Sequence, residues 1–463
     1  MKKLSFITHR VLKAGLISAL AAFISSCGWI DTELNVNPDE PGDVPMSLLV
    51  PGIQQNMGFI LMGNNSVRTT NMWMQLYDGV SRQSHSEARY QLTPADVNNY
   101  WQSLYTEELM NAKILTDKAV EEGSPHNEGL GKILTAYSLA VATDLFGDIP
   151  YSDALKGAEG VMQAKYDTQE QIYNTIFSLL DDAIAKLGAA EEPVGIEGDV
   201  IYGGDAAAWI NAARAIKARA ELQLSKQNGT TAYNNALALV DAFSSSADDM
   251  EVPFETANPN PVFQFMQDRT DIRICQTWLD ELESTNDPRI PFYVALDENG
   301  EYTGSEAGAE NEAASYLGDY MAGNTAPVVL MSYAELKFIE AEAALMTGDA
   351  DRAATAYKAG VAASVAKVTG AANQEWLDAN IETETGGTIT LEKIIMQKRH
   401  ALVGQVQPFS DWRRTGIPTL SLVIGATTTE VPRRFPYSQE EIIYNPDNVP
   451  SYGTITNRVW WDQ

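Results

Sequence analysis

Residue types that often carry catalysis are few in this chain of 463 residues. Four histidines occur (His9, His85, His126 and His400), and none of them forms the H-x-x-x-H or H-x-H spacing of a zinc site. The sequence also lacks a G-x-S-x-G elbow, a G-x-x-x-x-G-K-[ST] phosphate loop and a G-x-G-x-x-G dinucleotide motif. We therefore expect neither a catalytic site nor a cofactor, and the histidine spacing predicts no zinc site.

Carboxylates are the most abundant candidates for acid–base chemistry. A glycosidase needs two of them about 5–10 Å apart. Among 62 acidic residues some pair always meets that condition, so the number does not discriminate. The stretch "DLFGDIPYSDAL" (144–155) contains three aspartates and could be a metal or acid site. It is better explained as a helix end, in which Gly147 ends the helix, Pro150 prevents its restart and the aspartates cap loop amides.

Aromatic residues collect in two segments that show little helical periodicity. Residues 73–105 contain six where the chain average of 9% predicts about three, namely Trp73, Tyr77, Tyr90, Tyr100, Trp101 and Tyr105. Residues 296–325 are polar and glycine-rich and contain Tyr302, Tyr316 and Tyr320. Long loops on a rigid scaffold commonly carry function. We expect these two segments to be such loops.

The elements that must position these loops are helices. The segment "TQEQIYNTIFSLLDDAIAKL" (168–187) has the 3.6-residue period of an amphipathic helix. Residues 134–147 are apolar nearly all round, which predicts a buried helix, and residues 207–226 form a third, alanine-rich pattern. Together these patterns predict an all-α fold.

One pair of helical segments has the spacing of a known repeat. In "AEAALMTGDADRAATAYKAGV" (341–361), the small and large residues Ala341, Ala353, Tyr357 and Gly360 match positions of a tetratricopeptide repeat. Segments 207–245 and 134–187 are weaker versions of the pattern. Because such repeats bury their cores only by stacking, we expect one continuous tetratricopeptide-like helical body with long loops.

The N-terminus has the pattern of an export signal. Basic residues in "MKKLSFITHRVLK" precede the apolar run "AGLISALAAFI", which is shorter than the roughly 20 residues that a membrane-spanning helix needs. The following "ISSC" resembles the lipobox of bacterial lipoproteins. That resemblance implies that residues 1–26 are a signal peptide and that Cys27 is acylated, for example by palmitate. An ordinary secretory signal with an incidental cysteine is the alternative. Lipidation leaves Cys275, the only other cysteine, as a buried free thiol.

The charge of the chain excludes some partners. After removal of residues 1–26 the chain would have 28 basic and 62 acidic residues, a net charge of −34. This charge argues against nucleic acid and against anionic lipid as ligands. Arg413, Arg414, Arg433 and Arg434 are expected to pair with the abundant carboxylates.

Several stretches resemble, in chain order, the characteristic segments of the SusD/RagB family. The stretch "ATDLFGDIPYSDAL" is similar to the "DLYGDIPYSEAL" that is common in that family. The other matching stretches are "LNVNPDEP", "WQSLYTEELMNAKIL", "NDPRIPFY", "MSYAELKFIEAEAAL", "QKRHALVGQVQPFSDWRRTGIPTL" and "PRRFPYSQEEIIYN". They run from near Cys27 to the C-terminus, so the resemblance covers the whole mature chain.

The resemblance implies a fold, a place and a role. It implies a single SusD-like helical domain over residues 27–463, lipid-anchored on the outer membrane and facing the cell surface. It implies a partner, a TonB-dependent barrel transporter of the SusC type, to which the lipoprotein delivers a captured nutrient, most often an oligosaccharide. Peptide capture by a related transporter is the alternative, and a glycosidase is less expected because no catalytic constellation is present.

Family membership does not identify the ligand-contacting residues, so these must be inferred from chemistry. Aromatic rings stack on the C–H faces of sugars, and Arg, Asn, Gln and Asp bond to the hydroxyls. A stacking ring must be exposed or half-exposed. The candidates are Trp73, Tyr77 and Arg82 in the first segment and Tyr302, Tyr316 and Tyr320 in the second. Trp73 and Tyr77 lie four residues apart and could equally be core residues, as we expect for Trp101 and Tyr105.

Overall fold

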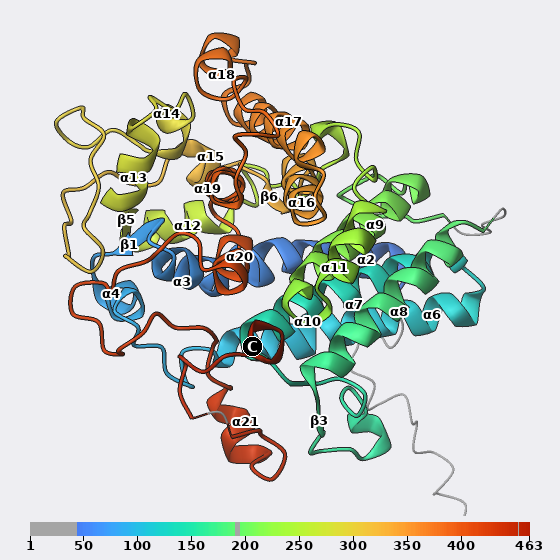
Figure 1. Ribbon diagram of the computed structural model, residues 1–463. Coiled ribbons are helices and arrows are strands. Elements are labelled where there is room, and N and C mark those ends of the chain that lie inside the picture. The colour runs from blue at the N-terminus through green and yellow to red at the C-terminus, as the bar shows by residue number, and fades with distance from the viewer. Residues whose placement is uncertain (1–43, 190–194, 452) are drawn as a thin grey trace, which may run out of the picture. The chain divides into compact units, whose positions relative to one another are not determined.

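The computed structural model describes residues 44–189, 195–451 and 453–463. Residues Met46–Gln463 form one compact unit, and helices make up most of it (Figure 1). The strands in the described chain form three two-stranded antiparallel ribbons. The structure confirms the expected all-α fold. The expected signal peptide (residues 1–26) and the expected acylation site, Cys27, lie outside the described residues.

The first half of the described chain contains ten helices. They are α2 (Met46–Asn56), α3 (Asn65–Trp73), α4 (Arg82–Ala88), α5 (Asn98–Ser103), α6 (Met110–Glu122), α7 (Pro125–Phe146), α8 (Gln169–Leu187), α9 (Ala206–Gln223), α10 (Ser225–Asn228) and α11 (Thr230–Leu237). Two π-helical turns, Met57–Leu61 and Leu104–Leu109, extend α2 and α5.

The second half contains shorter helices and two longer ones. They are α12 (Pro261–Asp268), α13 (Gln276–Glu283), α14 (Ile290–Tyr293), α15 (Asp319–Ala322), α16 (Tyr333–Met346), α17 (Ala350–Thr369), α18 (Gln374–Asn380), α19 (Leu391–Ala401), α20 (Gln407–Thr415) and α21 (Gln439–Tyr444). The ribbons pair β1 (Tyr77–Gly79) with β5 (Ile272–Ile274), β2 (Ile149–Pro150) with β3 (Tyr166–Asp167), and β4 (Met250–Val252) with β6 (Val328–Met331).

The long helices pack in chain order. Helix α7 contacts α6 and α8, α8 contacts α9, and α9 leads through α11 to α16. Helix α8 begins with a capping box between Thr168 and Gln171, and it buries one apolar stripe. Helix α7 is buried on nearly all sides, as its sequence predicts, and it ends at Gly147, whose φ of 85° favours glycine. These successive helix pairs form the helical body, and the short helices and the strands pack on it.

The structure confirms the repeat-like pair in 341–361. Helices α16 and α17 pack against each other. The turn between them contains Gly348 at a φ of 92°. The Tyr357 and Phe338 rings meet edge to face, with centroids 6.4 Å apart. A Cβ on Gly360 would lie 3.3 Å from the Phe338 ring, so the small residue sets how closely the helices approach.

The helix-end interpretation of 144–155 is confirmed for Gly147 and Asp148. Asp144 instead lies within α7, is partly buried, and accepts side-chain hydrogen bonds from Tyr173 Oη at 2.6 Å and Trp461 Nε1 at 2.9 Å. Asp148 Oδ1 accepts from the backbone N–H of Gln169 at 2.8 Å, at the start of α8. Across the described residues no group of His, Cys, Asp and Glu side chains has the arrangement of a metal site.

The expectation that residues 73–105 form a loop is wrong. The segment contains β1, α4, α5 and the π-helical turn that follows α5. Strand β1 exists because it pairs with β5, which lies far along the chain, so local sequence gives no sign of it. Trp101 is buried with its ring centroid 5.0 Å from that of Phe146, which confirms its core assignment, and Tyr105 is partly buried beside it. Of the second expected loop, residues 296–325, residues 296–318 are irregular as expected, and Asp319–Ala322 form α15.

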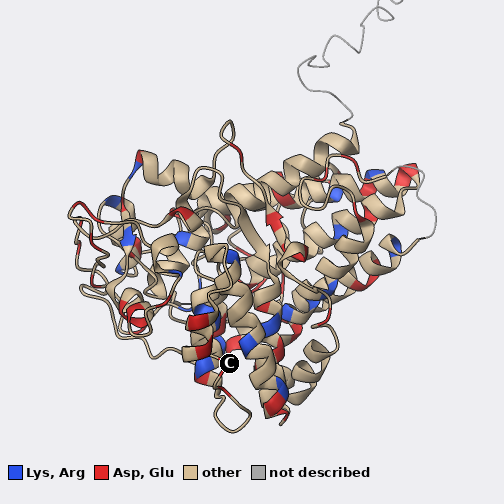
Figure 2. Ribbon diagram, turned by 90° about the horizontal axis from the view of Figure 1, so that it is seen from above, with Lys and Arg blue, Asp and Glu red and all other residues tan. Residues whose placement is uncertain are grey.

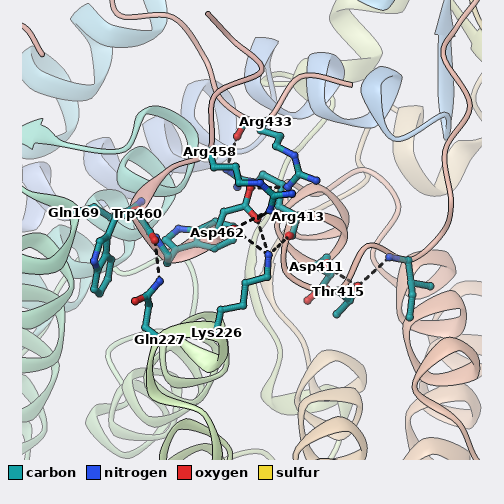
Figure 3. A network of polar contacts seen from close by, with 12 residues as sticks. Gln169, Lys226, Gln227, Asp411, Arg413, Thr415, Arg433, Arg458, Trp460 and Asp462 are labelled. Atoms are coloured by element: carbon teal, nitrogen blue, oxygen red, sulfur yellow. Dashed lines mark hydrogen bonds and ion pairs between the residues drawn. The ribbon is translucent and has the colours of Figure 1, made fainter. Parts of the chain in front are cut away.

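Charged residues form a buried network near the C-terminal end of the chain. The carboxylate of Asp462 is fully buried and pairs with Lys226 at 2.8 Å, Arg433 at 2.6 Å and Arg458 at 3.1 Å (Figure 3). This network ties the C-terminal turn to α10 and to the segment after α20. Elsewhere acidic and basic residues are interspersed along the helices (Figure 2).

The expected pairing with carboxylates is confirmed for Arg414 and Arg433. Arg433 pairs with Asp462, and Arg414 pairs with Glu342 and Asp411. Arg413 instead donates to the backbone carbonyls of Asp144 and Arg433 and lies over the Trp461 and Phe409 rings. Arg434 lies over the Tyr437 ring.

Candidate functional site

Three segments that are distant in sequence converge on β1 and β5. They are α4, the irregular residues 296–318 and residues 421–427 (Figure 1). The Gly308 N–H donates to Asp78 Oδ1 at 2.8 Å, and Arg89 Nη2 donates to the Gly308 carbonyl at 2.8 Å. The Ile424 N–H donates to the Ala307 carbonyl at 2.9 Å. These bonds hold the irregular segment against α4 and β1, so its side chains have a fixed scaffold. We call this surface the α4–β5 face.

A basic stripe lies along α4. Arg82, His85 and Arg89 are spaced by three and four residues, which places them on one side of the helix. Arg82 pairs with Asp271, and its side chain is 52% exposed. His85 Nε2 and Arg89 Nη2 each lie 2.8 Å from Oε1 of Glu310, on the irregular segment.

Two of the candidate tyrosines lie on this face. Arg273, on β5, stacks on the Tyr316 ring with its guanidinium carbon 3.7 Å from the ring centroid, and the ring is still 39% exposed. The Ser315 N–H donates to the Thr303 carbonyl at 3.0 Å, and the Thr303 N–H donates to the Ser315 hydroxyl at 3.0 Å, so the chain next to Tyr302 is bonded to the chain next to Tyr316. Arg82 contacts Asp271, which directly precedes β5, and Tyr316 contacts Arg273 on β5. Arg82 and Tyr316 therefore lie against neighbouring residues of one segment, and Tyr302 lies beside Thr303, which bonds to Ser315.

Three candidates do not belong to this face. Trp73 is fully buried between Phe409 and Phe435 and donates its indole N–H to the Glu87 carbonyl at 3.0 Å. Tyr77 is 2% exposed, with its hydroxyl 3.1 Å from Met321 Sδ. Of the two alternatives left open for Trp73 and Tyr77, this burial supports the core, and neither residue presents an open ring as a binding candidate must. Tyr320 is partly buried against Tyr293 and lines a small cavity of about 40 Å³ together with Tyr77.

Backbone strain is concentrated around the α4–β5 face. Eight described non-glycine residues have a positive φ, and four of them surround this face: Arg82 (49°), Tyr90 (70°), Thr270 (51°) and Glu310 (61°). Such conformations cost stability and persist where surrounding contacts enforce them, commonly at functional sites. This concentration supports the face as a site on grounds independent of aromatic content.

Burial perturbs the acids behind the face. It raises the pKa of Glu87 to about 7, although Arg68 and hydrogen bonds from Gln83 and Thr69 oppose the shift. It also raises the pKa of Asp78, against the Ser305 hydroxyl and the Gly308 N–H. Cys275 is a buried free thiol, as expected, and burial raises its pKa to about 12. A thiol with that pKa is unreactive near neutral pH.

The sequence did not single out four residues that shape the face: His85, Arg89, Arg273 and Glu310. A signal for the first two was present in the three- and four-residue spacing of "RQSHSEAR". No comparable signal exists for Arg273 and Glu310, because their roles depend on pairing between distant segments. Two hollows of about 340 and 290 Å³ lie elsewhere, beside α21 and between α6 and residues 151–156. Neither contains any of the candidate residues.

Comparison with known proteins places the chain in a family. A family model described as "Starch-binding associating with outer membrane" (SusD-like) matches residues 39–438. A SusD/RagB family protein from Bacteroides thetaiotaomicron has a similar solved structure, with a TM-score of 0.74 and 24% identity over 91% of this chain and 99% of that one. A chitin-binding SusD homolog from Flavobacterium johnsoniae superposes with a TM-score of 0.76 and 22% identity over 90% of this chain and 98% of that one.

No curated protein sequence matches the chain. Among the described residues no helix is long and apolar enough to cross a membrane. The solved neighbours are below 25% identity and establish the fold, whereas the family model covers most of the sequence. The chain belongs to the SusD-like family, whose members are described as starch-binding and as associating with the outer membrane.

Proposed function

We propose that this protein is a cell-surface lipoprotein that captures an oligosaccharide on the α4–β5 face and passes it to a TonB-dependent barrel transporter of the SusC type. Three observations support the proposal. The chain belongs to a family described as starch-binding. A neighbour of the same fold is described as chitin-binding. The face combines a half-exposed ring with arginine, histidine and carboxylate groups, which suits the C–H faces and hydroxyls of a sugar.

The observation that carries the proposal is the placement of Tyr316. Its ring is held against Arg273 but remains 39% exposed, so part of its surface is available for stacking. The other candidates with accessible groups, Arg82 and Tyr302, lie on the same face. Tyr320 stays a weaker candidate because its ring packs on Tyr293.

The test is ligand binding by Tyr316→Ala, measured by calorimetry against starch and chitin oligosaccharides. Loss of the ring should weaken binding by roughly 1–3 kcal/mol, by analogy with stacking of bases on aromatic rings. Tyr316→Phe is the matched control and should bind nearly as well as the wild type. The melting temperature should change little in either variant, since the ring is at the surface. Unchanged affinity of Tyr316→Ala would remove this face as the sugar platform.

Two further measurements separate the alternatives. Peptides should bind weakly in the same assay, and tight peptide binding that depends on Tyr316 would favour the peptide-capturing alternative. Turnover of any tested glycan by the purified protein would argue for an enzyme. For the delivery step, a C-terminally tagged protein isolated in mild detergent should co-purify with a TonB-dependent barrel. Its repeated absence, when other barrel complexes survive, would contradict the transporter partnership.

A further inference from the structure

The Glu310 carboxylate lies against two basic side chains on the α4–β5 face. A single oxygen, Oε1, contacts both His85 Nε2 and Arg89 Nη2 at 2.8 Å. The Glu310 side chain is 48% exposed, while those of His85 and Arg89 are only 23% and 24% exposed. The basic groups are therefore set into the surface, and the acidic group reaches them from the solvent side.

Stability does not explain this contact. Glu310 adopts a φ of 61°, a conformation that disfavours any residue with a Cβ. An exposed ion pair contributes little stability to offset this strain. Glycine or asparagine would make the same turn with less strain. The segment is also held without Glu310, because Asp78 and Arg89 already bond to the backbone of Gly308.

The basic stripe also departs from what helix α4 would favour. Arg82 is the first residue of α4, where the helix dipole disfavours a cation. The acid on this helix, Glu87, is 2% exposed and faces Thr69 rather than the stripe. In a chain with 62 acidic and 32 basic residues, three basic groups on one helix side form a local exception. The carboxylates of Asp271 and Glu310 pair directly with this stripe, so each cation in it already has an anionic partner.

We propose that His85 and Arg89 form a binding seat for an anionic group, and that Glu310 fills this seat until ligand arrives. The inference rests on the proposed capture of a glycan and specifies its class: an oligosaccharide with a carboxylate or sulfate group. That group displaces the Glu310 carboxylate, with Arg82 nearby and Tyr316 stacking on the sugar. One anion replaces another, so Arg89 keeps a charged partner throughout. A neutral sugar offers only hydroxyls and cannot replace the ion pair, which makes the seat selective.

The test compares Glu310→Gln, Arg89→Gln and His85→Gln with the wild type in calorimetry. The probes are oligogalacturonate for carboxylate, chondroitin sulfate oligosaccharide for sulfate, and maltohexaose for a neutral glycan. Glu310→Gln should bind the preferred acidic probe several-fold more tightly, because the internal competitor is gone. Arg89→Gln should bind it about tenfold more weakly, the effect of one charge-assisted hydrogen bond. In every variant the affinity for maltohexaose should change less than the affinity for the acidic probe, because a hydroxyl does not replace the charged partner of Arg89.

Glu298→Gln is the matched control. It removes the same charge from an exposed residue of the same segment, twelve positions before Glu310. If Glu298→Gln gained as much affinity for the acidic probe as Glu310→Gln, the change in net charge would explain both gains. That result would overturn the seat. Unchanged affinity for the acidic probes in Glu310→Gln and His85→Gln would overturn it as well, and neither result depends on whether Arg89→Gln remains folded.

The pattern of probes separates this inference from the proposed function. Tighter binding of either acidic probe than of maltohexaose supports the seat, and the better of the two identifies carboxylate or sulfate. Binding of maltohexaose alone overturns the seat and leaves glycan capture standing. Binding of none of the three overturns the seat, and it overturns glycan capture as well if the chitin oligosaccharide of the first test also fails to bind. If a peptide with a free C-terminal carboxylate binds through Arg89 and its amidated form does not, the ligand is a peptide and the glycan assignment is wrong.

Discussion

Trp73 and Tyr316 are two aromatic candidates with opposite placements. The indole of Trp73 meets Phe409 and Phe435 edge to face at centroid distances of 5.6 and 5.3 Å, and its N–H is satisfied by a backbone carbonyl. Tyr316 rests one ring face on a guanidinium and keeps 39% of its surface exposed. The first residue therefore holds core elements together, whereas the second can meet a ligand.

Trp73→Ala should destabilise the protein without a specific effect on ligand binding. Removing a fully buried indole leaves a cavity, and substitutions of this kind cost about 3–5 kcal/mol. Urea denaturation measures the loss, with Trp73→Phe as a milder variant that keeps part of the packing. If Trp73→Ala instead bound ligand more weakly but kept the stability of the wild type, Trp73 would be a ligand-binding residue.

Glu108 should make stability depend on pH. Burial raises the pKa of its carboxyl to about 8, although Asn56 and Ser138 donate to it. The folded state therefore holds this proton more tightly than the unfolded chain, whose pKa is near 4.5. The stabilising contribution is complete below about pH 4.5 and is lost as the pH rises through about 8.

Glu108→Gln removes this dependence, because the amide stays neutral. Its free energy of unfolding, relative to the wild type, should rise by roughly 1–3 kcal/mol between pH 5 and pH 9. Parallel urea titrations at several pH values measure this difference. A constant difference over that range would mean that Glu108 titrates as an ordinary surface carboxyl.

Close approach of helices is set by small residues in this fold. Gly360 on α17 faces the Phe338 ring of α16, and a Cβ there would lie 3.3 Å from ring carbons. On α7, a Cβ at Gly129 would meet the Leu187 side chain of α8 at 2.8 Å. These two positions fix the separation of helix pairs on which the rest of the body is stacked.

Gly360→Val should lower stability by about 1–3 kcal/mol, because the larger side chain forces the helices apart. Ala363→Val on the same helix is the control, since Ala363 is only partly buried and the substitution costs little beyond helix propensity. Chemical denaturation of both variants measures the two losses in unfolding free energy. Equal losses would show that the valine itself, and not the α16–α17 contact, causes the effect.

Residues Met46–Gln463 form one compact unit, in which the C-terminal turn is tied back through Asp462 to α10 and the segment after α20. A unit of this kind should unfold in a single transition, with a circular dichroism spectrum dominated by helix. The lipid anchor is proposed to hold this unit at the membrane through the chain that follows Cys27.

Cys27→Ser should release the protein from the membrane. The apolar run is too short to span a bilayer, so binding depends on acyl chains, each buried methylene of which contributes about 0.8 kcal/mol. Membrane fractionation and labelling with a palmitate analogue measure the change, and Cys275→Ser serves as the control that keeps the anchor. A Cys27→Ser protein that stays on the membrane and still takes up the label would contradict lipidation at this position.

The sequence by itself determined the long helices, the repeat-like pair and the family. Helical periodicity and capping are local properties, so α8 and the Gly348 turn are visible in a window of about twenty residues. The burial of Cys275 and Trp101 followed from their surroundings in the same way.

Only the tertiary structure decided which aromatic rings are open and which charges meet. Strand β1 forms by pairing with β5, and this pairing buries Tyr77 and turns an expected loop into ordered elements. The contact of Glu310 with His85 and Arg89 joins residues more than two hundred positions apart. Composition cannot reveal such contacts, because the exposure of a side chain depends on which distant segment covers it.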